Sequence, residues 1–423
     1  MTASDIYDYS RIKCLDQIKK DKDVRHITRA VYPGFHCPLY TATNLFASID
    51  RLAVLIIGTE ECTYYSRCRE GFYDKNNFFS LVLDKHDITF GFSKGLLSAV
   101  EKVKKLNEFD ALVIITTCVV ELIGEEISSI IDEINRDKSF IVLLVKTNHY
   151  QIDTPTIGLE EGLKALVFLM ERHERIDGTV NILGPRQDGF EQSELAAILK
   201  RNGISINTRI PDKCTIQTIR FATSAELNIV THYSALKIAK CMKEKFGIEY
   251  VYFDSFSDPY RIRGSYLDLQ RILKIDILAE IDELFNTVLT KMAKIKPLSE
   301  NKSFIISMPP MFSYEIASFL CKIGMKPLWL QTLGLKGHDD KYVKEILSFG
   351  HNPKICRAIN KAPLDAVFQS EKPDIYFSGD FHGHNTKNEP GIITLNKELK
   401  GRGFEIPLKI LNRLSINFEK RQI

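Results

Sequence analysis

Short apolar runs rich in β-branched residues alternate along the chain with longer amphipathic stretches. The runs have the length of strands, and we predict strands at residues 52–58, 111–117, 139–145, 179–184, 227–232, 249–256, 303–307 and 374–380. In the stretches between them, apolar residues recur at helical spacing, which predicts helices at 92–109, 158–173, 192–203 and 232–247. Gly203 and Gly247 stand at the expected C-caps of the last two helices.

Continuous apolar strands that alternate with helices are typical of parallel sheets covered on both faces. The predicted fold class is therefore α/β, with three Rossmann-like domains, each a mostly parallel sheet flanked by helices. A chain of 423 residues is too long for one ordinary core, and polar or charge-rich turns near 175 and 298 mark the boundaries. The predicted domains are residues 1–175, 176–298 and 299–423.

The composition is that of a globular protein, with 44% hydrophobic and 26% charged residues. A net charge of +3 over this length leaves no basic stripe, which argues against nucleic acid as a partner. The first ten residues lack a secretory pattern, and no apolar run approaches the roughly 20 residues that span a bilayer. We therefore expect no membrane partner, a cytoplasmic location, and nine cysteines that stay reduced.

Three of these cysteines lie on turns beside predicted strands. Cys118 directly follows strand 111–117, Cys62 follows strand 52–58 after a short turn, and Cys37 precedes the first strand. Because ligands gather outside the carboxyl ends of parallel strands, these thiols could form one site, and thiolates select iron–sulfur clusters, zinc or copper(I). The alternative is that each fills space in a core, as free cysteines often do.

The remaining cysteines we interpret as core fillers: Cys14, Cys68, Cys214, Cys241, Cys321 and Cys356. No CxxC pair occurs, so a zinc ribbon has no support.

Several segments resemble the nitrogenase component 1 family. "CTYYSR" (62–67) is similar to that family's "GCxYYS", and "TTCVVELIGEEI" (116–127) is similar to its "TTC…E.IGDDI". The linking segment 83–103 and the strand–helix–strand unit 227–256 also resemble the family, so that the resemblance extends over most of the chain. It implies three domains around a central cavity, with Cys37, Cys62 and Cys118 as the three cluster-binding cysteines.

Three cysteines leave the ligand set of an iron–sulfur cluster incomplete. The resemblance implies a [4Fe-4S] or P-cluster-like [8Fe-7S] cluster shared at an interface with a paralogous subunit or a second copy of this chain. It also implies a homodimeric, ATP-dependent iron–sulfur reductase as electron donor, and Arg67 and Arg69 could contribute to its docking surface or simply be solvated. The chain itself has no GxxxxGK[ST] motif for ATP.

In the catalytic α subunit of nitrogenase, a cysteine and a histidine hold the large cofactor. Here His232 stands at the aligned cysteine position, and the histidine cannot be matched, which argues against dinitrogen reduction on a standard cofactor. His232 could donate a proton or ligate a different, unknown metallocofactor, or it could be a hydrogen-bonded turn residue. A similar choice applies to Asp380, His382 and His384, which could line a cavity or form a polar surface loop.

The sequence also predicts local structural roles for Gly124, Glu125 and Glu126, which follow Cys118 in the chain. Gly124 should permit close packing, and Glu125 and Glu126 should lie early in the next helix, where the helix dipole favours negative charge, or be solvated.

Together these observations predict the catalytic component of a nitrogenase-like two-component reductase. The alternatives are a scaffold subunit for assembly of a complex iron–sulfur cofactor, or an α/β binding protein without metal.

Overall fold

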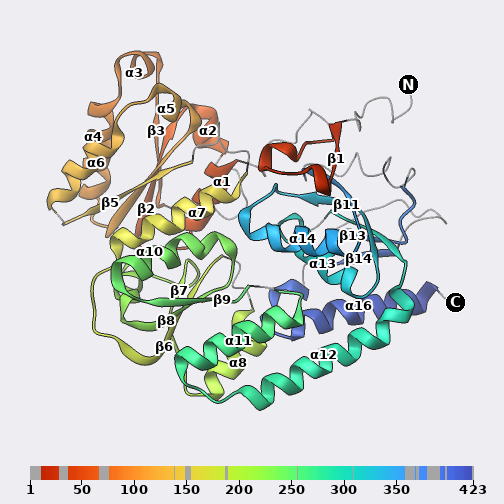
Figure 1. Ribbon diagram of the computed structural model, residues 1–423. Helices are drawn as coiled ribbons and strands as arrows, with labels where there is room; N and C mark the ends of the chain where they lie inside the picture. Colours follow the sequence, from red (N-terminus) through yellow and green to blue (C-terminus); the bar gives the residue numbers. More distant parts are fainter. Residues whose placement is uncertain are drawn as a thin grey trace. The chain divides into compact units, whose positions relative to one another are not determined.

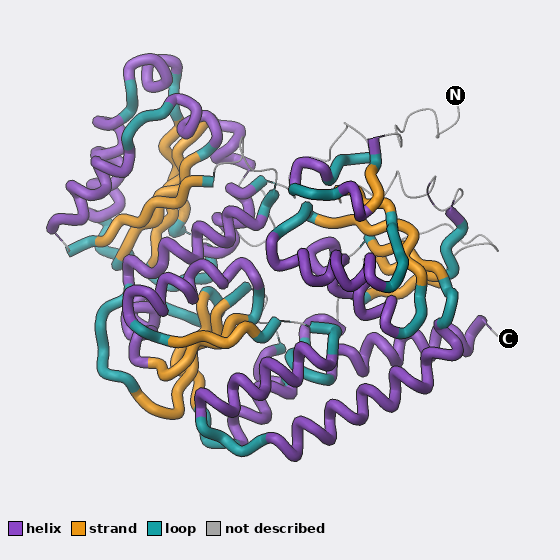
Figure 2. The backbone as a smooth tube through the Cα atoms, in the orientation of Figure 1, coloured by secondary structure: helices purple, strands orange, loops and turns teal. Residues whose placement is uncertain are grey.

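The structure is a computed structural model, and it describes residues 11–27, 37–65, 76–137, 139–147, 154–185, 189–254, 256–307, 309–357, 367, 371–378, 391–395 and 398–421. These residues form three mostly parallel sheets with helices packed against them (Figures 1 and 2). The predicted α/β class with three Rossmann-like sheets is confirmed. The chain divides into two compact units: Pro33–Gln187 with Leu199–Asp254, and Met1–Tyr32 with Asp188–Ile198 and Ser255–Ile423.

The first sheet has four parallel strands in the order β3-β2-β4-β5. Their bounds are β2 (Leu52–Gly58), β3 (Phe78–Val82), β4 (Ala111–Thr116) and β5 (Ile141–Lys146). Every residue of β2 and β4 is buried, because these central strands are covered on both faces.

Helices cover both faces of this sheet (Figure 1). On one face lie α1 (Pro38–Phe46) and α7 (Thr156–Ala165), which share a core with alternate residues of β2 and β4. On the other face lie α4 (Ser93–Lys105) and α6 (Ile127–Ile134), which pack on the intervening residues. The period-2 alternation of a strand thus divides its side chains between two cores.

The second sheet has the order β7-β6-β8-β9 and is also parallel. Its elements are β6 (Ile176–Leu183), α8 (Glu194–Arg201), β7 (Ser205–Ile210), α9 (Ile216–Arg220), β8 (Ala225–Val230), α10 (Leu236–Phe246) and β9 (Glu249–Tyr252). Gly247 is the left-handed C-cap of α10, as predicted.

The third sheet has six strands in the order β1-β12-β11-β10-β13-β14, with β1 antiparallel to the rest. Its strands are β1 (Lys13–Cys14), β10 (Ser303–Ile306), β11 (Lys326–Thr332), β12 (Lys354–Arg357), β13 (Ile375–Ser378) and β14 (Gly391–Thr394). Helices in this part of the chain are α11 (Pro259–Leu273), α12 (Leu278–Ser299), α13 (Ser313–Lys322), α14 (Asp340–Ser348) and α16 (Glu405–Arg421).

The predicted domain boundaries stay predictions. Pro297, taken from the sequence as part of a polar turn, lies in the last turn of α12. No described helix combines the length and the apolar character needed to cross a membrane.

A buried ladder of asparagines ties the second sheet together. Asn181 of β6 donates from Nδ2 to the Ala222 carbonyl (2.7 Å) and to Asn228 Oδ1 (2.8 Å), and its Oδ1 accepts from Asn207 Nδ2 (2.9 Å). Asn181 and Asn228 are fully buried. The ladder joins three neighbouring strands through side chains as well as backbone.

We expect Asn181→Ala to lower the free energy of unfolding by about 1–3 kcal/mol, because it leaves its buried polar partners without their hydrogen bonds. Urea unfolding followed by circular dichroism measures the effect. The exposed Asn76→Ala is the matched control and should change stability little. Equal stability of the two variants would contradict the ladder's importance.

Candidate functional site

Cys62 and Cys118 lie at the carboxyl edge of the first sheet, after two neighbouring strands. β2 pairs in parallel with β4, with Ile57 opposite Thr116, so the two strands end side by side. Cys62 lies in α2 (Glu60–Tyr65), which follows β2, and Cys118 is the first residue of α5 (Cys118–Ile123), which follows β4. The prediction that both lie at the same sheet edge is confirmed.

Cys37 reaches this edge from a helix that precedes the first strand. It is the N-cap residue of α1, with extended backbone angles (φ −78°, ψ 122°), and Pro38 occupies the first helical position. Because α1 runs back toward the amino end of β2, its N-terminus lies at the carboxyl end of the sheet. Cys37 and Cys62 also pack against the same hydrophobic core.

The three thiols interact electrostatically. Burial raises the pKa of the Cys37 thiol, N–H groups of Leu39 and Tyr40 offset part of this rise, and the charges of Cys118 and Cys62 add to it. Burial also raises the pKa of Cys118, and Cys62 is the next largest cause. Each pair within the trio is thus close enough for one thiolate to disfavour another, and a bound cation would relieve that repulsion.

Three of the other described cysteines differ from this trio in burial. Cys214, Cys321 and Cys356 are buried, and burial raises the pKa of each thiol to about 12. Their predicted role as core fillers is confirmed. Cys37, Cys62 and Cys118 are partly exposed, as are Cys14 and Cys241, whereas Cys68 lies outside the described residues.

Glycine permits the close approach of the two strand ends. A Cβ on Gly58, the last residue of β2, would lie 2.5 Å from Thr117 Cγ2 and closer still to its Oγ1. Thr117 is the N-cap of α5 and precedes Cys118, and its N–H donates to the Ile57 carbonyl (3.1 Å). The missing side chain at Gly58 therefore lets the start of α5 pack against β2.

A second glycine permits close packing next to Cys37. A Cβ on Gly158 of α7 would overlap the Pro38 carbonyl oxygen and lie 2.5 Å from Thr41 Oγ1. The backbone of α7 thus contacts the first turn of α1, directly after Cys37. Sequence reasoning placed Gly158 in a helix but assigned it no role in the site.

The segment after Cys118 differs from expectation in two details. Gly124 does not permit close packing: it is the left-handed C-cap of α5 (φ 76°), and a Cβ there would meet nothing within 4 Å. Glu125 is not in the following helix either. Its carboxylate caps the start of α4 by accepting from the Phe92 N–H (3.0 Å) and the Ser93 hydroxyl, whereas Glu126 is the exposed N-cap of α6.

Large apolar side chains are exposed around the same sheet edge. Tyr64 of α2 is 65% exposed, Phe90 of α3 (Lys85–Phe90) is 75% exposed, and Leu122 of α5 is 66% exposed. The three helices follow β2, β3 and β4. Exposed aromatic and aliphatic side chains grouped around one edge are typical of a surface that another protein covers.

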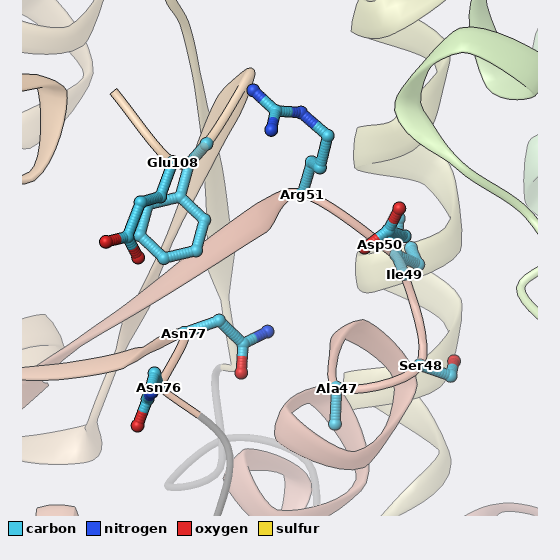
Figure 3. A pocket seen from close by; sticks show the side chains of 9 residues that line it. Ala47, Ser48, Ile49, Asp50, Arg51, Asn76, Asn77 and Glu108 are labelled. Atoms are coloured by element: carbon cyan, nitrogen blue, oxygen red, sulfur yellow. The ribbon is translucent and has the colours of Figure 1, made fainter. Parts of the chain in front are cut away.

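A described cavity of about 370 Å³ lies at the opposite, amino edge of the first sheet (Figure 3). Residues that precede β2, β3 and β4 line it, among them Arg51, Asn77 and Glu108. Arg51 is engaged by Asp110, with Nε and Nη2 each 2.8 Å from a carboxylate oxygen. This cavity is separate from the cysteines, and ligands of open α/β sheets bind at the other edge.

One group in the described part of the chain has three potential ligand atoms within 4.8 Å of one another: Asp84, His86 and Asp87. Asp84 and Asp87 form the capping box of α3, so this geometry is explained by helix capping. The sulfur atoms of Cys37, Cys62 and Cys118 do not meet this distance criterion.

His232 follows β8, in the second sheet, and is buried. Its Nδ1 accepts from the Ser234 N–H (3.3 Å) and hydrogen bonds to the Ser234 hydroxyl (2.8 Å), so it caps the turn Tyr233–Ala235. These contacts are those of a structural turn histidine, and a catalytic role stays a prediction.

Five other residues singled out from the sequence lie outside the described residues: Arg67, Arg69, Asp380, His382 and His384.

A model of the family described as nitrogenase component 1 type oxidoreductase matches residues 37–393. The chain belongs to this family. The resemblance predicted from the cysteine-containing segments is thereby confirmed.

Individual relatives differ in role. One subunit of the light-independent protochlorophyllide reductase from Heliobacterium modesticaldum is 26% identical over 43% of this chain, a match that spans only 36% of that protein. The nitrogenase iron-molybdenum cofactor biosynthesis protein NifE from Methanococcus maripaludis is 22% identical over 76% of this chain and 69% of that protein. A solved structure of nitrogenase Cp1 at pH 6.5 has a TM-score of 0.72 over 94% of both chains at 14% identity, which shows that the fold is shared.

Gly58→Ala should displace Thr117 and with it the start of α5, and lower the free energy of unfolding by about 1–3 kcal/mol. Urea unfolding measures the loss of stability, and alkylation of Cys118 followed by mass spectrometry measures the displacement. Gly264→Ala in α11 is the control, because a Cβ there meets nothing within 4 Å. Gly58→Ala with unchanged stability and unchanged Cys118 reactivity would disprove the contact's role.

The raised pKa values of Cys37 and Cys118 predict a pH dependence in the metal-free protein. A thiol whose pKa lies above its ordinary value of 9.0 keeps its proton, and so stays unreactive, to higher pH. Iodoacetamide labelling of both residues should therefore rise at a more alkaline pH than labelling of an unstructured cysteine peptide. Midpoints at or below that of the peptide would contradict the prediction.

Proposed function

We propose that this chain is the component 1-like subunit of a nitrogenase-like two-component reductase. It would accept electrons from an ATP-dependent homodimeric iron–sulfur reductase and pass them, through a cluster at a subunit interface, to a substrate or metallocofactor. The observation that carries the proposal is the placement of Cys62 and Cys118 after two neighbouring parallel strands, with Cys37 at the start of α1 near the same sheet edge.

The donor set fits an iron–sulfur cluster. Thiolates are the ligands that such clusters take, and the three thiols are partly exposed rather than sealed in a core. When bound, a [4Fe-4S] or [8Fe-7S] cluster would supply one-electron transfer, and Cys37, Cys62 and Cys118 would hold it.

Three thiols do not complete the ligand set, so we infer that a paralogous subunit or a second copy of this chain supplies the rest. The exposed Tyr64, Phe90 and Leu122 around the same edge support a protein partner there. Burial between subunits would exclude water, which is one determinant of a cluster's reduction potential.

The second candidate is a scaffold subunit on which a complex iron–sulfur cofactor is assembled. The observation that supports it is the match to NifE from Methanococcus maripaludis, which covers 76% of this chain. The two candidates share the cysteines and differ in what happens to the bound iron.

Cys37→Ala, Cys62→Ala and Cys118→Ala should each lose most of the bound iron, because each removes one ligand. Iron analysis and visible absorption near 400 nm after anaerobic purification measure the loss. Cys241→Ala in α10 is the control, since Cys241 is also partly exposed but lies within a helix of the second sheet. Equal iron content in all four variants, or no iron in the unaltered protein, would refute the assignment.

The iron-loaded protein then separates the candidates. A reductase component should support ATP-dependent electron transfer from its partner reductase to a small molecule. A scaffold should instead transfer the complex iron–sulfur cofactor assembled on it to an apo-protein, without turnover of a small molecule.

A further inference from the structure

Near Cys118 lies a carboxylate, that of Glu121, of which one oxygen accepts hydrogen bonds and the other has no hydrogen-bond partner among the described residues. Glu121 lies three residues after Cys118 in α5, so both side chains lie on the same face of that helix. Its charge also contributes to the raised pKa of the Cys118 thiol, which places the two groups close together. This glutamate lies in the family-like segment 116–127, but no role was expected for it from the sequence.

The first oxygen of Glu121 fastens α5 to two strand ends. Oε1 accepts from the Thr147 N–H (2.6 Å), directly after β5, and from the Thr116 hydroxyl (2.8 Å), at the end of β4. Both threonines are 1% exposed. A third bond, from Thr147 Oγ1 to the Thr116 carbonyl (3.2 Å), closes the network. The first turn of α5, which begins with Cys118, is therefore attached to the sheet through one carboxylate oxygen.

The second oxygen of Glu121, Oε2, does not attach α5 to the sheet. Oε2 is buried and has no hydrogen-bond partner among the described residues. A buried carboxylate oxygen without a partner costs free energy, and such groups in native proteins usually serve a function. Attachment of α5 needs only Oε1, so it does not explain why a carboxylate rather than an amide stands here.

We propose that Glu121 is a positioning residue for Cys118 and that its negative charge lowers the reduction potential of the cluster that Cys118 helps to hold. The first role belongs to Oε1, which fixes the helix turn that presents the sulfur. The second belongs to the charge itself, because a fixed negative charge disfavours the added electron of a reduced cluster. This inference rests on the proposed role of Cys118 as a cluster ligand.

Two substitutions separate the two roles. Glu121→Gln keeps an oxygen that can accept from Thr147 and Thr116 but removes the charge, whereas Glu121→Ala removes both. The exposed Glu126→Gln, five residues along the chain, is the matched control for loss of a nearby negative charge.

We expect Glu121→Gln to retain iron as the control does, but to shift the cluster's midpoint potential upward. A tenfold change in the one-electron equilibrium corresponds to about 59 mV. Glu121→Ala should weaken iron retention against a chelator by about 10- to 100-fold, the usual effect of losing an outer-shell partner. In the metal-free protein both substitutions remove the charge that helps to raise the pKa of Cys118, so both should speed its alkylation, and Glu121→Ala should speed it more because it also frees the first turn of α5.

The measurements are anaerobic redox titration followed by electron paramagnetic resonance, chelator competition, and thiol labelling with mass spectrometry. A midpoint potential of Glu121→Gln equal to that of Glu126→Gln would overturn the charge role. Equal rates of Cys118 labelling in Glu121→Ala and Glu121→Gln would overturn the positioning role. If the unaltered protein binds no iron, the proposed function fails, and labelling of metal-free Cys118 still decides whether Glu121 positions it.

Discussion

The arrangement of the candidate site depends on the parallel pairing of β2 with β4. Two neighbouring parallel strands must end at the same edge, and here one ends at Gly58 and the other at Thr116. The segments that leave those ends carry Cys62 and Cys118. Hydrogen bonds of the sheet therefore set the spacing of the two thiols, although 55 residues separate them in the sequence. Substitution of a thiol leaves this framework intact, whereas a shift in strand register would move both segments.

Around that pairing, small residues and buried polar groups refine the positions. Gly58 and Gly158 each remove a side chain where backbone meets a neighbouring segment, next to Cys118 and Cys37 respectively. Thr116, Thr147 and Glu121 then connect α5 to the ends of β4 and β5. Close packing of Gly58 and the hydrogen bonds of Glu121 thus act on the same short helix, α5. Such support is what metal ligands need from their surroundings.

The sequence predicted the central strands well because burial on both faces leaves a continuous apolar run. Residues 52–58 were predicted as a strand and form β2 over the same range. β3 was missed because it lies at the sheet edge, where only its first residue, Phe78, is buried. β12 was missed because it has only four residues, two of them Lys354 and Arg357, and takes its place from pairing with β11. The positions of Cys62 and Cys118 could be predicted from strand ends, whereas Cys37 precedes the first strand and reaches their edge through the direction of α1. The need for glycine at positions 58 and 158 arises only from contacts between segments distant in the sequence.

The contact of Gly158 with the first turn of α1 has a consequence for biosynthesis. Cys37 leaves the ribosome well before the helix that packs against its neighbour Pro38, because that helix begins only at Thr156. At a translation rate of about 5–20 residues per second, several seconds separate the emergence of the two segments. During that interval Cys37 lacks the packing that fixes its position, so that under the proposed function a cluster would bind to all three thiols only after α7 has docked.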